Sequence, residues 1–171
     1  QSTRNHCGDI TNTDSIGQPL IKLITLECKR GYSRHTIADL LDCSEKSALQ
    51  EYEKFFDQAE TSRQNSGSYA WGVIVKRDQR DALFFIPRYL WDILKDASVF
   101  AEDSTGGDFI DIGPVVHLTA FFRRKNDIQI RQTVVGMKLD QFLQNTKPNK
   151  IIELTAKIGW EKDAGNDQVV S

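Results

Sequence analysis

The feature that most constrains the fold is a short apolar run that ends in charged residues. Residues 20–30 read LIKLITLECKR, with Gln-Pro before them and Gly-Tyr-Ser shortly after. A short apolar run that contains threonine and lies between turn residues is typical of a β-strand. Because both faces are apolar early in the run, we expect a central strand. Strand alternation places Thr25, Glu27 and Lys29 on one face, and Cys28 on the other as a core residue.

The rest of the chain alternates between helical and extended patterns. Apolar residues recur at helical spacing over 44–65, and Gly67 is placed to end that helix. Paired apolar runs predict β-hairpins over 68–87 and 115–135. Shorter helices are predicted over 36–42, 89–96 and 139–145, with a loop over 101–114 and fraying over the last ten residues. This order predicts a mixed α/β (α+β) domain.

Composition limits the classes of protein to which the chain can belong. Its 171 residues are 39% hydrophobic and 27% charged, which favours one domain over residues 1–171. The formal net charge of −2 gives no overall positive field. Three cysteines without a CxxC pair indicate free thiols in a reducing compartment. No run approaches the roughly 20 apolar residues that span a bilayer. We therefore expect a cytoplasmic protein without a membrane partner.

Glu27 and Lys29 need compensation if they are buried, because an unpaired buried charge costs several kcal/mol. If residues 9–12 begin a strand antiparallel to residues 20–29, the carboxylates of Asp9 and Glu27 converge. Two such carboxylates hold a hard divalent cation, and the backbone carbonyl of Cys28 supplies a third oxygen ligand. Lys29 would then stabilise negative charge that develops on a phosphate.

These residues carry a resemblance to a known family. The chain has Asp9, then seventeen intervening residues, then Glu27-Cys28-Lys29 at the end of an apolar strand. This arrangement resembles the PD-(D/E)xK nuclease superfamily, with Gly8 in place of the proline. The stretch from GDI through LIKLITLECK, FFDQAE and YAWGVIVKRDQRDALFFI resembles small phage and bacterial members, some of them Holliday-junction-resolvase-like. The likeness covers about residues 6–87. The family's N-terminal helix and first strand do not fit into the eight residues before Asp9, so that helix is expected to be absent.

The resemblance implies a restriction-endonuclease-like fold, which is a central mixed β-sheet flanked by helices. It also implies a DNA endonuclease that depends on Mg²⁺ (or Mn²⁺) and serves recombination, repair or phage DNA processing in a bacterial or phage-infected cell. Asp9 and Glu27 would bind the metal, and Lys29 would be the catalytic cation. Many nucleases of this kind work as dimers, which implies a possible homodimer, for which the hairpin over 116–135 would offer a surface.

Other residues have a functional and a plain interpretation. Gln58, on the predicted long helix, either supports the metal site or faces solvent. Arg30 and Arg34 follow the Glu-x-Lys motif and either contact phosphates or belong to a solvated loop. Three basic residues of the second hairpin allow the same two interpretations; they are Arg123, Arg124 and Lys125. His117 lies within a predicted strand and is expected to be a core histidine.

Two alternatives to the nuclease remain open at this point. One is a catalytically inactive DNA-binding module that keeps the same fold, which the acidic overall balance favours. The other is a protein-interaction module unrelated to nucleic acid. Salt-dependent DNA binding without hydrolysis would distinguish the first, because contacts with phosphates release counterions.

Overall fold

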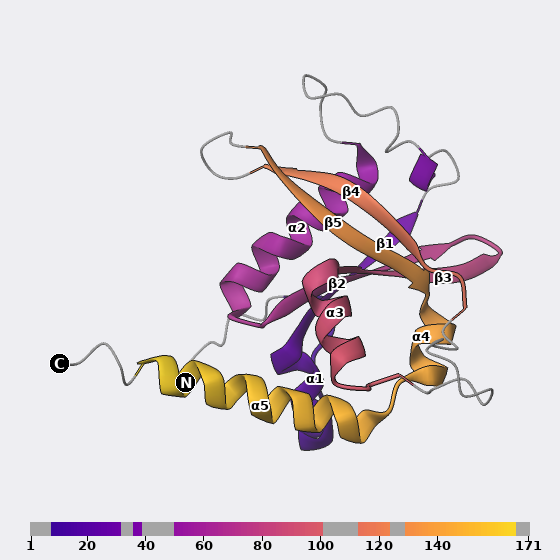
Figure 1. Ribbon diagram of the computed structural model, residues 1–171. Helices are drawn as coiled ribbons and strands as arrows, with labels where there is room; N and C mark the ends of the chain where they lie inside the picture. Colours follow the sequence, from indigo (N-terminus) through magenta and orange to yellow (C-terminus); the bar gives the residue numbers. More distant parts are fainter. Residues whose placement is uncertain (1–7, 32–35, 39–49, 101–112, 124–128, 167–171) are drawn as a thin grey trace.

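The computed structural model describes residues 8–31, 36–38, 50–100, 113–123 and 129–166. These residues form a five-stranded sheet flanked by helices, which is a mixed α/β fold (Figure 1). The strands are β1 (Ile24–Gly31), β2 (Ala70–Arg77), β3 (Arg80–Pro87), β4 (Val116–Arg123) and β5 (Gln129–Lys138). The helices are the 3₁₀ turn η1 (Ser15–Gly17), α1 (Gln18–Leu23), α2 (Glu51–Ser66), α3 (Arg88–Asp96), α4 (Leu139–Asn145) and α5 (Pro148–Asn166).

The order of the strands in the sheet is β1-β2-β3-β5-β4. Strands β1 and β2 are parallel, and the three other neighbouring pairs are antiparallel. The chain between β1 and β2 includes α2, as a parallel pair requires a crossover connection. In this pair Glu27 lies opposite Val73 and Lys29 lies opposite Val75. The Glu-x-Lys motif is therefore on the first strand of the sheet.

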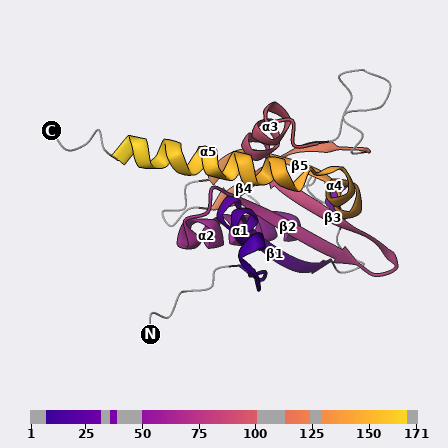
Figure 2. The same ribbon diagram turned by 90° about the horizontal axis from the view of Figure 1, so that it is seen from below.

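Each face of the sheet has its own apolar core. On one face, Phe56 and its neighbours on α2 pack against Trp71, Val73 and Phe85, and the Phe56 ring stacks on the Trp71 ring with centroids 5.5 Å apart. The opposite core gathers residues of α1, α3, α4 and α5 around β3 residue Phe84. Figures 1 and 2 show α2 apart from α3, α4 and α5, and α5 running beside α1. The side chains of alternate residues in each strand thus enter different cores.

The strand predicted over residues 20–30 begins only at Ile24, because residues 18–23 form α1. Pro19 lies in the first turn of α1, where its missing N–H removes no hydrogen bond. Leu23 at the end of this helix is 1% exposed and joins the core. A six-residue helix is too short to show helical periodicity, so its apolar residues could not be told from those of a strand.

The expectation that this strand is central is wrong for the described sheet, in which β1 is the first strand. Its apolar residues have a different cause. The side chain of Leu26 enters the core that contains α1 and α5, and α2 covers the other face of β1. An edge strand covered by helices on both faces has the apolar pattern of a central strand.

Most other predicted elements are confirmed. The long helix is α2, with Gln50 and Glu53 as a capping box at its start and Gly67 (φ 73°) at its end; residues 44–49 lie outside the described residues. Both hairpins and the helices α3 and α4 form where they are predicted. The sequence analysis missed α5, which extends into the last ten residues to Asn166. In the described part of the chain, no helix is both long and apolar enough to cross a bilayer.

Candidate functional site

The Glu27 and Lys29 side chains form an ion pair on the α2 face of β1. Lys29 Nζ donates a hydrogen bond to Glu27 Oε2 at 3.0 Å, and the Lys29 and Glu27 side chains are 14% and 4% exposed. Ser62 on α2 donates a hydrogen bond to the other carboxylate oxygen, Oε1, at 2.7 Å. The predicted sharing of a face is therefore confirmed, and the pair is not a surface salt bridge. The Lys29 charge and the two hydrogen bonds compensate for burying the carboxylate.

Sequence analysis missed Ser62, although the pattern of α2 contains a signal for it. The apolar stripe of this helix runs through Tyr52, Phe55 and Ala59, and Ser62 is the next position at helical spacing. A hydroxyl that continues an apolar stripe faces the sheet and needs a partner there. Which partner it finds depends on how α2 crosses β1, and this crossing is not visible in the sequence.

Asp9 lies along the outer edge of β1. Its backbone N–H donates to the Leu26 carbonyl at 2.8 Å, and its side-chain oxygen Oδ2 accepts from the Cys28 N–H at 2.8 Å. The strand predicted over residues 9–12 does not form, since two hydrogen bonds fix Asp9 alone and residues 10–12 belong to no helix or strand. The structure nevertheless brings Asp9 beside the strand that carries Glu27.

Gly8 explains how the chain approaches β1 so closely. Its φ is 97°, a conformation that residues with a side chain rarely adopt. A Cβ atom at this position would lie 3.0 Å from the Leu26 carbonyl oxygen and 3.0 Å from Thr25 Cγ2. Proline has φ fixed near −65° and cannot take this conformation. A glycine at this position, where the superfamily that the motif resembles has proline, therefore fits the local backbone.

The backbone of Cys28 contributes to the same edge. Residues of a strand direct their N–H and C=O groups alternately to the two edges, so the Cys28 carbonyl points to the edge where its N–H meets Asp9. The expectation that the Cys28 side chain is a core residue is wrong, because the thiol is exposed near the end of β1. Partial burial raises the pKa of the thiol, the charges of Asp9 and Glu27 raise it further, and the Lys29 charge lowers it.

The other predicted site residues that the structure describes do not join this arrangement. Gln58 is exposed on α2, as its plain interpretation expects. Arg30 forms an exposed ion pair with Asp78 at 3.0 Å. His117 is exposed on β4, so its assignment as a core histidine is wrong; β4 is the last strand in the sheet order. Arg34, Arg124 and Lys125 lie outside the described residues, as does the side chain of Arg123.

Three oxygen donors thus lie on or beside the middle of β1: the carboxylates of Asp9 and Glu27 and the carbonyl of Cys28. Among the described residues, no group of three or more His, Cys, Asp or Glu side chains is placed to hold a metal ion. Mg²⁺ does not need such a group, because it usually keeps several waters and binds through one or two carboxylates. The donor chemistry therefore fits a hard divalent cation that is only partly coordinated by protein.

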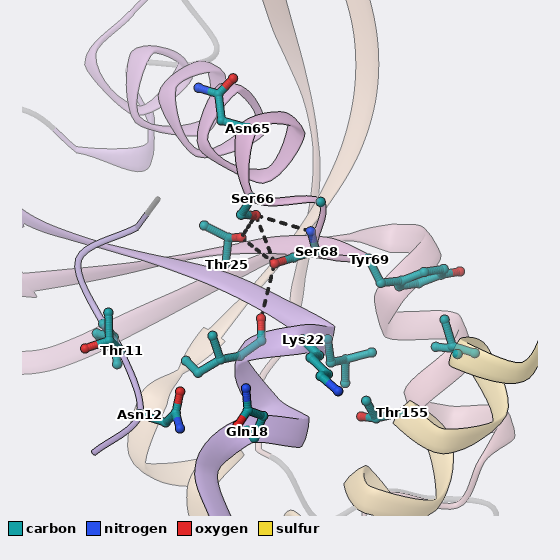
Figure 3. A pocket seen from close by; sticks show the side chains of 16 residues that line it. Thr11, Asn12, Gln18, Lys22, Thr25, Asn65, Ser66, Ser68, Tyr69 and Thr155 are labelled. Atoms are coloured by element: carbon teal, nitrogen blue, oxygen red, sulfur yellow. Dashed lines mark hydrogen bonds between the residues drawn. The ribbon is translucent and has the colours of Figure 1, made fainter. Parts of the chain in front are cut away.

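A separate cavity of about 780 Å³ opens at the beginning of β1. Figure 3 shows the hydroxyls of Thr25, Ser66 and Ser68 grouped in it, and the Thr25 oxygen lies 2.6 Å from that of Ser66 and 2.8 Å from that of Ser68. Lys22 is the one charged side chain among the described residues that line this cavity. The hydroxyls of the two serines donate to main-chain carbonyls, so much of their hydrogen-bonding capacity is used within the protein.

Comparisons with protein-family models, with curated proteins and with solved structures found no match. The geometry around Glu27 and the resemblance of the sequence motif are therefore the observations that bear on function.

Proposed function

We propose that the protein is a metal-dependent DNA endonuclease that hydrolyses phosphodiester bonds with Asp9, Glu27 and Lys29. The observation that carries the proposal is the buried Glu27–Lys29 ion pair with Asp9 hydrogen-bonded to the same strand. Glutamate and lysine are seldom buried unless they are paired, and a buried charged pair with a second carboxylate beside the same strand is a candidate for a functional site. The order of motif strand, helix α2 and parallel strand β2 also agrees with the resemblance drawn from the sequence.

Each residue of the site has a role in this proposal. Asp9 and Glu27 would hold Mg²⁺ or Mn²⁺, together with the Cys28 carbonyl. When bound, the ion activates a water molecule and stabilises charge on the phosphate. Lys29 would stabilise the negative charge that develops on the phosphate oxygens. Ser62 would hold the Glu27 carboxylate in position through its hydrogen bond to Oε1.

The reaction is the addition of water to one phosphodiester. A water oxygen forms a bond to phosphorus while the bond from phosphorus to one ester oxygen breaks. The leaving oxygen gains a proton and becomes a hydroxyl, and the phosphate remains on the other end. Cutting both strands of a duplex takes two such sites, for which a homodimer is the simplest arrangement. DNA inside the cell is the proposed substrate.

The direct test is cleavage of supercoiled plasmid, single-stranded and four-way-junction DNA with Mg²⁺ or Mn²⁺. Asp9→Asn and Glu27→Gln keep the size of each side chain and remove its charge. Asp14→Asn is the matched control, because Asp14 is an exposed acid of the same segment. The Asp14 side chain accepts a capping hydrogen bond from the Ile16 N–H, and an asparagine side chain can accept the same bond. We expect at least a hundredfold loss of cleavage in the first two variants and wild-type cleavage in the control.

A second variant series addresses the cation. Lys29→Ala leaves Glu27 buried without its ion pair, which costs about 3–5 kcal/mol, so it must be accompanied by a measurement of folding. Lys29→Arg keeps the charge but changes its geometry and serves as the milder change. If no DNA form is cut by the wild type, or if Asp9→Asn and Glu27→Gln cleave as fast as Asp14→Asn, the proposal is wrong.

One observation favours a second candidate, a DNA-binding module without turnover. Both oxygens of Glu27 already accept hydrogen bonds, one from Ser62 and one from Lys29. A carboxylate engaged in this way can serve structure alone. DNA binding that weakens with salt, together with no cleavage in Mg²⁺ or Mn²⁺, would support this candidate over the nuclease.

A further inference from the structure

The turn between β2 and β3 projects from the body of the molecule in both Figure 1 and Figure 2. Basic side chains gather on this turn and on the strand ends beside it, and we call them the basic tip. Its members are Arg30, Lys76, Arg77, Arg80 and Lys138. Two carboxylates lie among them, those of Asp78 and Asp81. The basic tip therefore has an excess of positive charge.

The register of the strands places these residues together. Arg30 lies opposite Lys76 across the β1–β2 pair, and Arg77 lies opposite Arg80 across the β2–β3 pair. Residues that are opposite each other in neighbouring strands have Cβ atoms about 5 Å apart. Like charges at this distance repel, and the repulsion is relieved when an anion binds between them.

The two carboxylates neutralise only part of the basic tip. Asp78 pairs with Arg30 at 3.0 Å, and Asp81 pairs with Lys138 at 2.9 Å. Lys76 and Arg77 instead donate hydrogen bonds to the main-chain carbonyls of Arg80 and Asp81. The hydrogen bond and charge of Lys138 lower the pKa of the Asp81 carboxyl below its usual value, and the charges of Arg77 and Lys76 lower it further.

The positive charge of the basic tip contrasts with the net negative charge of the whole chain. The chain has 22 lysine and arginine residues and 24 aspartate and glutamate residues, so the chain outside the basic tip has an excess of acidic residues. A positive tip on an acidic protein orients an approaching polyanion toward that tip, and the acidic remainder repels it elsewhere.

The basic tip continues from the candidate site. Lys29 and Arg77 lie on the same face of the sheet, since Lys29 is opposite Val75 and Arg77 is two residues further along β2. Strand spacing places their Cα atoms on the order of 8 Å apart. A polyanion held at Lys29 therefore meets Arg77 next and then Arg80, which lies opposite Arg77, whereas Lys76 and Arg30 project from the other face at the same strand ends.

We infer that the basic tip binds the phosphate backbone of nucleic acid, with Lys76, Arg77 and Arg80 as the residues that bind phosphates. The surface has repeated cations, most of them exposed, which suits a chain of phosphates better than a single small anion. The inference rests on the proposed function only for the direction in which the nucleic-acid strand crosses the protein. The binding itself is measured without any cleavage.

The test is binding of fluorescently labelled duplex and single-stranded DNA, followed by anisotropy over a series of salt concentrations with EDTA present. The variant Lys76→Gln/Arg77→Gln/Arg80→Gln removes all three cations. The variant Arg88→Gln/Lys95→Gln/Lys157→Gln is the matched control, because it removes the same charge from exposed positions on α3 and α5. A third variant, Lys76→Gln/Arg80→Gln, leaves the Arg77 hydrogen bond intact if the triple variant is unstable.

We expect wild-type affinity to fall steeply with salt and the control to follow it. Removing one cation that binds a phosphate reduces the slope of log K against log salt by about 0.9 on duplex DNA, so the slope should fall by about 2.7 in the triple variant and by about 1.8 in the double variant. Slopes equal to that of the control would overturn the inference, as would equal competition by polyglutamate, which marks a site for any polyanion. Loss of binding in these variants with no cleavage by the wild type would support the basic tip and contradict only the nuclease.

Discussion

At the scale of single residues, the hydroxyl of Ser62 is the feature that distinguishes the candidate site from an ordinary ion pair. Ser62→Ala removes a hydrogen bond to a buried carboxylate, and bonds to charged groups contribute about 1.5–3 kcal/mol to stability. We expect a loss of that size in chemical denaturation, together with slower cleavage. Thr61→Ala is the control, because Thr61 is exposed on the same helix and its hydroxyl donates to the Asp57 carbonyl of that helix; it should change stability by less than about 0.5 kcal/mol. Equal effects of the two changes would contradict the role of Ser62.

Tyr89 provides a prediction about pH. The pKa of the Tyr89 phenol is raised to about 12, mainly because the phenol is partly buried. The positive charge of Arg63 opposes this rise in pKa, and the negative charges of Glu60 and of ionised Tyr69 add to it. An unfolded tyrosine ionises near pH 10, so the contribution of Tyr89 to stability is complete below pH 10 and is lost as the pH rises toward 12. Ultraviolet absorbance should show a late-titrating contribution from Tyr89 in the wild type that is missing in Tyr89→Phe. Identical titration curves for the two proteins would show that the prediction is wrong.

For individual residues, the sequence predicts which face of a strand a side chain lies on, because this follows from alternation along the strand. Glu27 and Lys29 share a face as predicted, because period 2 holds along any strand. The same rule predicts Cys28 in the core, yet whether a face is covered at one position depends on where the flanking helices end. The partner of Ser62 depends on the crossing of α2 over β1, which is a property of tertiary structure.

At the scale of elements, Gly8 controls how the first described segment attaches to β1. Gly8→Ala introduces a Cβ 3.0 Å from the Leu26 carbonyl oxygen at φ 97°, a strain of about 1–2 kcal/mol. We expect residues 8–10 to detach locally, so that the amides of Asp9 and Cys28 exchange hydrogen faster and cleavage falls. Gly67→Ala is the matched control, because Gly67 also has positive φ (73°) but has open space around it and ends α2 far from Asp9 along the chain. Protection of both amides in Gly8→Ala at the wild-type level would contradict this prediction.

Elements are predictable where a local signal marks both ends. The hairpins have turn residues between apolar runs, and α2 ends at a glycine that has the left-handed conformation. The short helix α1 cannot be told from a strand in the sequence because six residues do not establish a period. For α5 the signal is present, since Ile151, Leu154 and Ile158 recur at helical spacing and pack against the core. That helix could have been predicted from the sequence.

At the scale of the whole molecule, the arrangement of strands is beyond sequence reasoning. Neighbouring strands of a hairpin pair by default, which gives β2 beside β3 and β4 beside β5. The sequence does not indicate that β5 rather than β4 joins β3, or that β1 begins the sheet. This order decides that Asp9 meets a free strand edge, and therefore that a carboxylate can lie beside Glu27 without interrupting the sheet.

Binding of a metal ion should be measurable as stabilisation of the whole fold. A ligand that binds only the folded state adds about 2.7 kcal/mol at a free concentration a hundred times its Kd, which for a chain of this length raises Tm by roughly 5 °C or more. We expect MgCl₂ or MnCl₂ to raise Tm in the wild type and in Asp14→Asn, and to have little effect in Asp9→Asn and Glu27→Gln. NaCl at matched ionic strength separates this from general screening of charge. If all four proteins respond alike, the ion does not bind through Asp9 and Glu27. If Tm rises only where both carboxylates are intact, the two side chains share one cation, and this holds whether or not any DNA is cut.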